Sequence, residues 1–268
     1  MNRKHTLKNF RFIFGIFLIS FILVLMVWGF VGSPYDITAM DKNLKFAPAS
    51  LKHLMGCDNF GRDIFSRVQA GIVNTFFISC MTVFIGTIGG IFIGALTGYF
   101  GGIVDEILMR INDVVLAFPS IFLALVIIGL IEPGKWNVIV ALGIAFVPSF
   151  ARIVRAEFLK EKQLDYVTSA KIMGASSFRI MFYHILPNCV PVIVSSIMIG
   201  FNNAVLAEAG LSYLGIGVQP PDASLGAMLS EAQSYLYKAP GMALFPGVIM
   251  VIMILGFSLI AEGLKRNG

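Results

Sequence analysis

Charged side chains are scarce in this sequence. Only 13% of the 268 residues are Asp, Glu, Lys or Arg, whereas 57% are hydrophobic and the mean hydropathy is +0.85. A soluble globular domain carries about 25% charged residues, so the composition excludes that class and indicates a polytopic membrane protein. The net charge of +5 does not indicate nucleic-acid binding, because the basic residues flank hydrophobic segments, where they orient a chain in the bilayer.

Cysteine and histidine are also rare. The three cysteines, Cys57, Cys80 and Cys189, lack the spacing of metal ligands and give no support to a disulfide framework. The three histidines are far apart and are expected on different faces of the membrane. No Gly-x-x-x-x-Gly-Lys-Ser/Thr phosphate loop occurs. We therefore expect no catalytic residue, no metal site and no cofactor bound by this chain, which cannot hydrolyse ATP unaided.

Long apolar runs dominate what the sequence does contain. Six are long enough to cross a bilayer as helices, at about 10–31, 73–98, 106–131, 136–156, 189–209 and 243–263. They predict an all-α membrane protein of about six transmembrane helices, with both termini on one side. The first run is long for a signal peptide and is followed by no clear cleavage site, so we expect an uncleaved anchor. We divide the chain into residues 1–72 (tail, first helix and external loop) and a core of residues 73–268.

Basic residues give the orientation. The segment 152–187 holds more of them than any other part of the chain: Arg152, Arg155, Lys160, Lys162, Lys171 and Arg179. Further basic residues lie in the N-terminal tail, which includes Arg3, Lys4 and Lys8, and at the C-terminal end in Lys265 and Arg266. The positive-inside rule places all of these in the cytoplasm, and with them both termini.

The basic segment 152–187 also has the pattern of a helical hairpin. Gly174 is expected to end a first helix, and Ser176 or Ser177 to cap a second, which Pro187 closes. The apolar faces are predicted to consist of Tyr166, Val167, Ala170 and Met173 on the first helix, and Phe178, Met181, Phe182 and Ile185 on the second. An amphipathic hairpin lying on lipid is one interpretation. The break between two short helices favours docking into another protein instead.

The same segment resembles the cytoplasmic loop of ATP-binding-cassette importer permeases. The matching residues are Thr168-Ser169-Ala170, Gly174 and His184-Ile185-Leu186-Pro187, with Thr168 where the family has Glu. The resemblance implies a coupling loop that docks into an ATPase subunit. The candidate docking residues are Tyr166, Ala170, Met173, Gly174, Ser176, Phe178, Met181, Phe182, Leu186 and Pro187.

Two further segments resemble the dipeptide, oligopeptide and nickel group of these permeases. Residues 53–67 match at His53, Gly56, Asp58, Gly61, Arg62, Asp63, Ser66 and Arg67, and residues 208–226 match through Glu208, Ser212, Gly217 and Gly226. A stretch between them, residues 98–120, matches at Gly101, Asp105, Arg110, Asp113 and Pro119. The resemblance therefore runs from about residue 53 to the C-terminus.

This resemblance implies a subunit of an ATP-driven importer in the bacterial inner membrane. The partners implied are a second homologous permease, two ATPase subunits that use ATP and Mg²⁺, and an extracellular or periplasmic solute-binding protein. The solutes implied are peptides, nickel or metal chelates. ATP binding would move the docked loop as a lever. Asp58, Gly61, Arg62 and Asp63 would help the external loop to receive solute.

Several residues within the apolar runs have a predicted structural role. Pro119 and Pro148 are expected to bend their spans, and Arg110 is a local ion-pair partner for Asp113. A glycine face that favours close helix packing over a sliding gate is formed by Gly86, Gly90, Gly94, Gly98 and Gly102.

Polar residues in the fifth span leave two interpretations open. Asn202 and Asn203 either line the solute path or form hydrogen bonds between helices, while Glu208 is expected to be structural. The alternative functions are an ion-gradient-driven secondary transporter or channel, and a membrane scaffold. The first would require ionisable mid-span residues and broken helices in an internal repeat.

Overall fold

A computed structural model describes residues 3–264, which are mainly helical and contain no β-strand beyond an isolated bridge between Cys57 and Asp63. Short 3₁₀ turns lie at Lys42–Leu44 and Gln233–Tyr235, and a π-helical turn lies at Ile180–Ile185. The α-helices are α1 (Arg3–Gly32), α2 (Ile64–Phe100), α3 (Gly102–Leu116), α4 (Ser120–Ile131), α5 (Lys135–Glu161), α6 (Asp165–Ile172), α7 (Ser177–Arg179), α8 (Leu186–Tyr213), α9 (Leu225–Ala232) and α10 (Gly241–Leu264).

The predicted spans are confirmed with one change at the second. Five helical stretches are long and apolar enough to cross a membrane, and α3 with α4 makes up to six if that bent pair is one span. The second span begins at Ile64 rather than 73, because Asp63 caps α2 by accepting from the Ser66 backbone N–H at 2.7 Å. The proposed domain boundary at 72/73 therefore falls inside α2.

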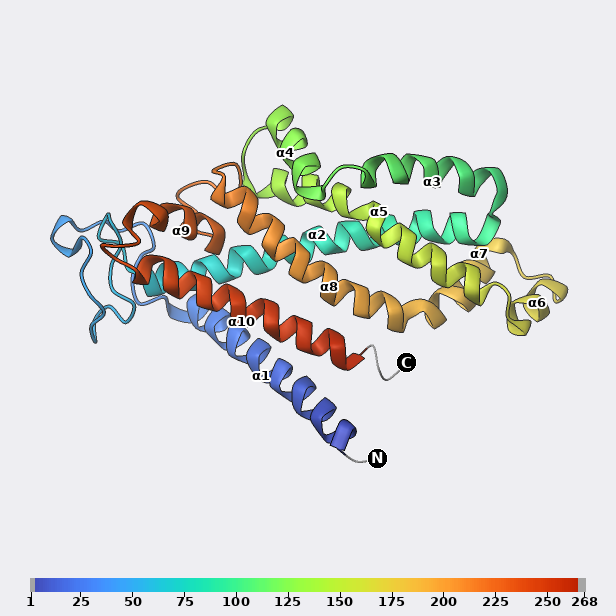
Figure 1. Cartoon of the computed structure of the whole chain (residues 1–268), viewed down its shortest axis with the longest axis horizontal. Coiled ribbons are helices and arrows are strands. Elements are labelled where there is room, and N and C mark those ends of the chain that lie inside the picture. Colours follow the sequence, from blue (N-terminus) through green and yellow to red (C-terminus); the bar gives the residue numbers. More distant parts are fainter. Residues whose placement is uncertain (1–2, 265–268) are drawn as a thin grey trace.

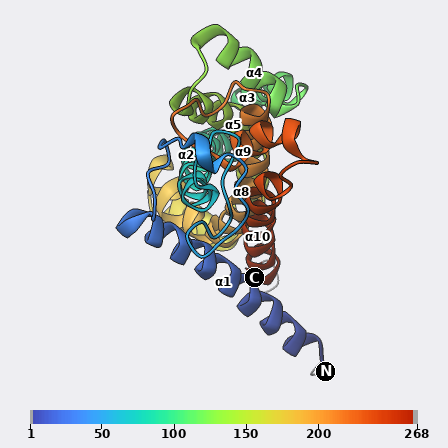
Figure 2. The ribbon, with the colours of Figure 1, turned by 90° about the vertical axis from the view of Figure 1, so that its left-hand side faces the viewer.

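The helices form an elongated bundle (Figure 1). α2, α5 and α8 lie along its length, with the external loop and α9 at one end and α6 and α7 at the other. α1 lies obliquely along α10 on the outside of the bundle (Figure 2). α1 begins and α10 ends toward the α6 end of the molecule (Figure 1). The basic termini Lys265 and Arg266, and the side chains of Arg3, Lys4 and Lys8, lie outside what the structure describes.

The glycine face of α2 packs directly on α5. A Cβ atom added at Gly86, Gly94 or Gly98 would lie 2.9, 2.6 or 2.5 Å from a Cβ atom of α5, which is closer than van der Waals contact allows. This confirms the packing interpretation, since only glycine lets the two backbones approach so closely. Gly102 does not belong to this face. It begins α3 with φ of +54° and has nothing within 4 Å of its Cβ position.

The third span is broken beside Pro119, where α3 and α4 meet at 86°. The predicted bend is confirmed here, whereas α5 continues as one helix through Pro148. The predicted partner of Asp113 is wrong, because its carboxylate pairs with Arg152 of α5 at 2.7 Å, and Arg110 lies 3.7 Å from Glu106 instead. The local sequence could not show that α3 lies beside α5.

Candidate functional site

The predicted hairpin, α6 to the start of α8, has the expected break. α6 ends just before Gly174, whose φ of +79° is a left-handed conformation that favours glycine. The Ser176 side chain then caps α7 by accepting from the Arg179 backbone N–H at 3.4 Å. The expected order of helix, glycine turn and serine cap is therefore confirmed.

Part of the predicted docking face is buried inside this chain. Met181 is only 4% exposed and Ala170 is equally buried, so neither can serve as an anchor for a partner. They pack with Val167, Ile180 and Ile185 against the C-terminal parts of α2 and α5, in a cluster with Ala95, Val154, Phe158 and Cys189. Part of each predicted apolar stripe thus holds the hairpin to the bundle.

A different set of side chains points away from the bundle. Met173 is 80% exposed and Phe178 is 67% exposed, and both were predicted as docking residues. Ile172 and Tyr183 are similarly exposed, and sequence reasoning missed them because they fall outside the apolar stripes. Gly174 and Ser176 are exposed, whereas Tyr166, Phe182 and Leu186 are half-buried. The face free for a partner is therefore the tip of the hairpin.

Pro187 does not close the second helix, which corrects the prediction. The π-helical turn Ile180–Ile185 runs directly into α8, and Pro187 is exposed in the first turn of α8. A proline inside a helix removes one backbone hydrogen bond, and here it directly follows the π-helical turn, a local change of hydrogen-bond register that a helix can contain without ending. The chain is consequently helical without interruption from Ser177 to Tyr213, so the hairpin is rigidly joined to a membrane span.

Tyr99 at the end of α2 connects the hairpin to the core. The ammonium groups of Lys162 and Lys171 lie 5.7 and 5.5 Å from the centre of its ring, within the range of cation–π attraction. Nearby, the Tyr166 hydroxyl donates to Glu161 Oε2 at 2.9 Å. Burial, followed by that hydrogen bond, raises the pKa of Tyr166 to about 12, so this contact keeps its proton at neutral pH.

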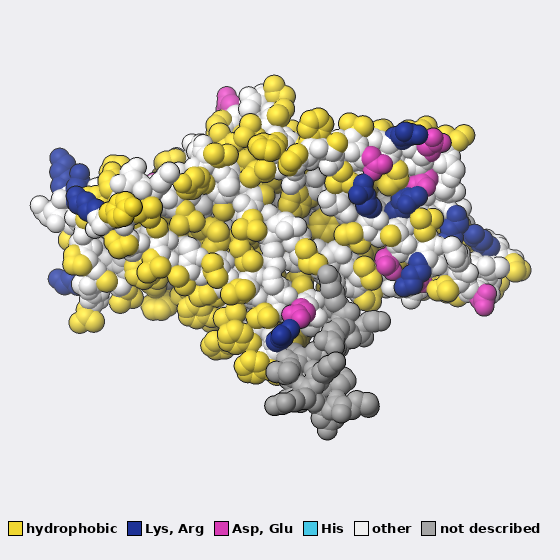
Figure 3. Space-filling view, viewed as in Figure 1, with side chains coloured by type: hydrophobic (Ala, Val, Ile, Leu, Met, Phe, Trp, Pro, Cys, Tyr) yellow, Lys and Arg dark blue, Asp and Glu magenta, His cyan; other side chains and the backbone are white. Residues whose placement is uncertain are grey.

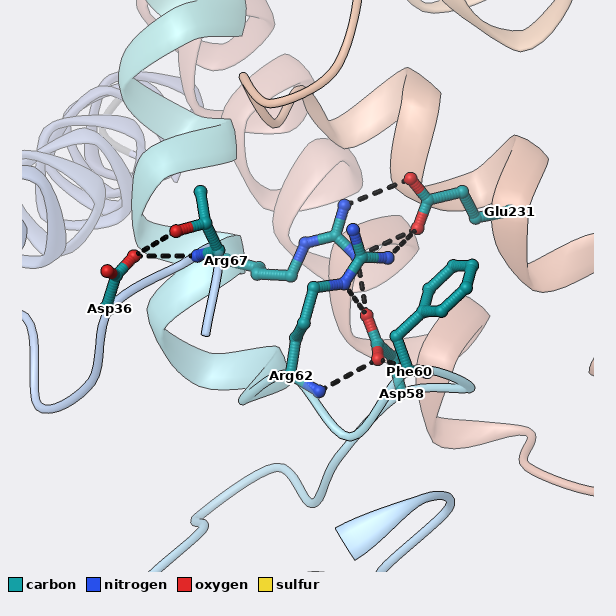
Figure 4. A network of polar contacts seen from close by, with 7 residues as sticks. Asp36, Asp58, Phe60, Arg62, Arg67 and Glu231 are labelled. Atoms are coloured by element: carbon teal, nitrogen blue, oxygen red, sulfur yellow. Dashed lines mark hydrogen bonds and ion pairs between the residues drawn. The ribbon is translucent and has the colours of Figure 1, made fainter. Parts of the chain in front are cut away.

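At the opposite end, residues of the external loop form a compact ionic cluster (Figure 4). Asp58 Oδ2 accepts from Arg62 Nε and from an Arg67 guanidinium nitrogen, each at 2.6 Å. Both arginines also donate to Glu231 of α9, at 2.7 Å from Arg62 and at 2.8 and 3.1 Å from Arg67. We call Asp58, Arg62, Arg67 and Glu231 the external cluster. Sequence reasoning missed Glu231, which is 164 residues from Arg67.

The other predicted loop residues are also buried supports. Asp63 caps α2, and its Oδ1 atom forms a hydrogen bond of 2.9 Å with His53 Nδ1. Gly61 has φ of +80°, and a Cβ there would collide with the backbone carbonyl of Asp41. Asp58, Arg62 and Asp63 are each less than 10% exposed. The structure therefore brings the four predicted loop residues together and uses them to fold the loop.

The polar residues of the fifth span differ in their contacts. Asn202 is buried and donates to Ser258 Oγ of α10 at 2.7 Å, and Glu208 accepts from Ser212 and Thr75 hydroxyls at 2.7 and 3.0 Å. Asn202 and Asn203 together line a pocket with Ser258 and Glu262. Asn203 also lines a cavity of about 360 Å³ together with Ser120, Ser149, Ser196 and apolar side chains of α5 and α8. No charged side chain lines that cavity.

The surface has a hydrophobic middle and two charged ends. On the face shown in Figure 3, hydrophobic side chains cover the middle of the molecule, and most charged side chains gather at its two ends. One exposed ion pair, Arg11 with Glu262 at 2.8 Å, joins α1 to α10. Within residues 3–264 no three His, Cys, Asp or Glu side chains are grouped so as to hold a metal ion.

Comparison with solved structures gives the fold. The MetNI methionine ABC transporter in an inward-facing conformation has a chain that aligns with a TM-score of 0.60 and 20% identity, covering 74% of this chain and 94% of that one. An amino acid ABC transporter with histidines aligns with a TM-score of 0.58 and 21% identity, covering 75% and 94%. At these identities the likeness establishes the architecture alone.

Comparison with curated protein sequences gives higher identities than the comparison with solved structures. The chain is 33% identical to the dipeptide transport system permease protein DppC of Haemophilus influenzae, over 98% of this chain and 94% of that protein. It is 40% identical to the glutathione transport system permease protein GsiD of Escherichia coli, over 94% and 83%. Residues 90–267 match the family model described as a binding-protein-dependent transport system inner membrane component. This chain belongs to that family, as an importer permease of the dipeptide and oligopeptide group.

Proposed function

We propose that this chain forms half of a peptide translocation path, pairs with a second homologous permease, and is driven by two ATPase subunits that bind ATP and Mg²⁺. The observation that carries the proposal is the uninterrupted helix from Ser177 to Tyr213. One end of this helix is the exposed hairpin tip, and its middle carries Asn203 in the 360 Å³ cavity. A displacement of the tip is therefore applied directly to a wall of the cavity.

The hairpin tip is the ATPase-docking surface. Ile172, Met173, Phe178 and Tyr183 expose apolar area at the hairpin end of the molecule. Such a cluster lies outside the apolar zone that lipid would cover, so a protein groove is the environment that removes it from water. With this end in the cytoplasm, the start of α1 and the end of α10 are cytoplasmic as well (Figure 1).

The solute is a peptide, and this subunit gives it a path that does not select for charge. The side chains that line the cavity offer hydroxyl and amide groups from Ser120, Ser149, Ser196 and Asn203 among apolar ones. Groups of this kind hydrogen-bond to a peptide backbone without requiring a particular side chain. The relatives named for dipeptide and glutathione transport support this class of solute. Selection then rests with the solute-binding protein, which delivers the peptide to the external loop and the α9 region.

The docking assignment is tested by loss of the ATPase subunits. Met173→Asp and Phe178→Asp each place a carboxylate on the exposed tip, and we expect copurification of the ATPases to fall about tenfold, as for a central interface residue. Leu51→Asp is the matched control, because Leu51 is fully exposed at the opposite end. ATPases that copurify with both tip variants at the wild-type yield would refute the docking surface.

A further inference from the structure

α9 is held at both of its ends by polar groups of distant segments. At its C-terminal end, Glu231 accepts from Arg62 and Arg67, which also bind Asp58 of the external loop (Figure 4). Glu231 is the one charged residue of α9. Each arginine contacts both carboxylates, so the external loop and α9 are joined through shared guanidinium groups.

The N-terminal end of α9 is held by a relay of hydroxyl groups. The Leu225 backbone N–H donates to Thr75 Oγ1 at 3.2 Å, and that hydroxyl donates to Glu208 Oε2 at 3.0 Å. Ser212 donates to the other oxygen of Glu208 at 2.7 Å and accepts from the Val218 backbone N–H at 3.1 Å. The fully buried Glu208 carboxyl thus holds, through these two hydroxyls, the backbone at Val218 between α8 and α9 and the start of α9 at Leu225.

α9 also lies directly on the external end of α8. A Cβ atom at Gly226 would lie 2.6 Å from the Ala209 Cα atom, and Ser230 Oγ donates to the Tyr213 carbonyl at 2.8 Å. No side chain separates the two helices at Gly226, so α9 cannot shift along α8 without displacing it. α8 is in turn continuous with the hairpin through Ile180–Ile185.

We propose that α9 is a strut that transmits the position of the external loop to α8 and so to the cytoplasmic hairpin, with Glu231 as the positioning residue that joins the strut to the loop. This inference rests on the proposed function, in which a solute-binding protein engages the loop. A protein seated on the loop displaces Asp58 and both arginines together. Glu231 follows because its carboxylate accepts from both arginines, and α9 then carries the displacement to α8.

Glu231 is the suitable residue for a test because its side chain is 29% exposed, whereas the other three members of the cluster are at most 10% exposed. Glu231→Gln removes the charge and keeps an accepting oxygen of the same reach. Glu231→Asp keeps the charge on a shorter side chain. Asp222→Asn is the matched control, since Asp222 is an exposed carboxylate of the same external segment and pairs only with Lys135 among the described residues.

Cys57 provides a readout of the loop that does not depend on transport. Its thiol is 1% exposed and adjacent to Asp58, and burial raises its pKa to about 11. A thiol in this state reacts slowly with maleimide. Release of the loop from α9 exposes the Cys57 thiol. The labelling rate of Cys57 by a membrane-impermeant maleimide therefore reports how firmly the loop is held to α9.

The experiment uses the complete complex in lipid nanodiscs, with ATPase activity measured with and without solute-loaded binding protein. For Glu231→Gln we expect Cys57 labelling to accelerate and the ratio of stimulated to basal ATPase activity to fall about fivefold, with the basal rate unchanged. For Glu231→Asp we expect a ratio of stimulated to basal activity between those of Glu231→Gln and the wild type, and for Asp222→Asn the wild-type ratio. Faster labelling with an unchanged ratio would overturn the strut, as would a parallel loss of basal and stimulated activity. A wild-type complex that the binding protein fails to stimulate would instead refute the proposed function.

Discussion

The external cluster and the hairpin tip both draw on segments that resemble the family's motifs, and they use their residues in opposite ways. At the external end, charged residues are buried against one another and fold a loop. At the cytoplasmic end, apolar residues such as Met173 and Phe178 are exposed. A motif match therefore does not tell whether its residues hold the fold or meet a partner, and burial is what separates the two roles.

The largest expected effect follows from removing Asp58. Asp58→Ala leaves Arg62 and Arg67 buried with Glu231 as their one remaining carboxylate, and we expect a loss of about 3–5 kcal/mol in the free energy of unfolding. Thermal unfolding of the purified protein in detergent measures it. Asp36→Ala, at an exposed carboxylate of the same loop, should change the stability by less than about 0.5 kcal/mol. Equal stabilities for both variants would show that the external cluster does not hold the loop.

A medium effect is expected at the hairpin turn. Gly174→Val forces a β-branched residue into φ of +79°, at a local cost of about 1–3 kcal/mol. Because nothing lies within 4 Å of its Cβ position, the strain is confined to the backbone of the turn. We expect hydrogen exchange to increase in α6 and ATPase copurification to decrease while the unfolding midpoint of the bundle is retained.

Gly174→Asn is the control for this effect, since Asn adopts the left-handed conformation more readily than other residues with a side chain. If Asn and Val variants lose the ATPases equally, the side chain itself obstructs docking and backbone strain is not the cause.

The smallest effect is expected at the link between hairpin and core. Tyr99→Leu removes the ring beneath Lys162 and Lys171, and each lost cation–π contact is worth about 0.5–1 kcal/mol. Tyr99→Phe keeps the ring and should behave as wild type. Faster hydrogen exchange of α6 in the Leu variant alone would assign this role to the ring, and an equal increase in both variants would assign it to the hydroxyl.

Much of the fold was predictable because bilayer thickness fixes the length of an apolar run. The helix break at Gly174 and the cap at Ser176 were also predictable, since both depend on local backbone chemistry. The burial of Met181 and Ala170 was not, because helical periodicity shows that a face is apolar without showing what covers it. The pairing of Glu231 with Arg67 joins segments that only the tertiary fold brings together.

The alternative of an ion-gradient-driven transporter is not favoured by these features. Its expected signs were ionisable mid-span residues and broken helices in an internal repeat, whereas Glu208 lies near the end of α8 and the α3–α4 pair is the one bent span among the described residues. The family assignment decides for the importer. In this chain Glu208 is surrounded by hydroxyl groups that bind backbone N–H groups, and its surroundings explain it without ion transport.

The glycine face between α2 and α5 also limits how the subunit can change shape. Where Gly86, Gly94 and Gly98 bring the two backbones into contact, no layer of side chains remains that could rearrange between alternative packings. α2 and α5 are thereby fixed to each other over most of the membrane thickness. Opening toward one side of the membrane and then the other is left to the joints around this pair, at the 86° bend between α3 and α4 and at the outlying α1 and α10.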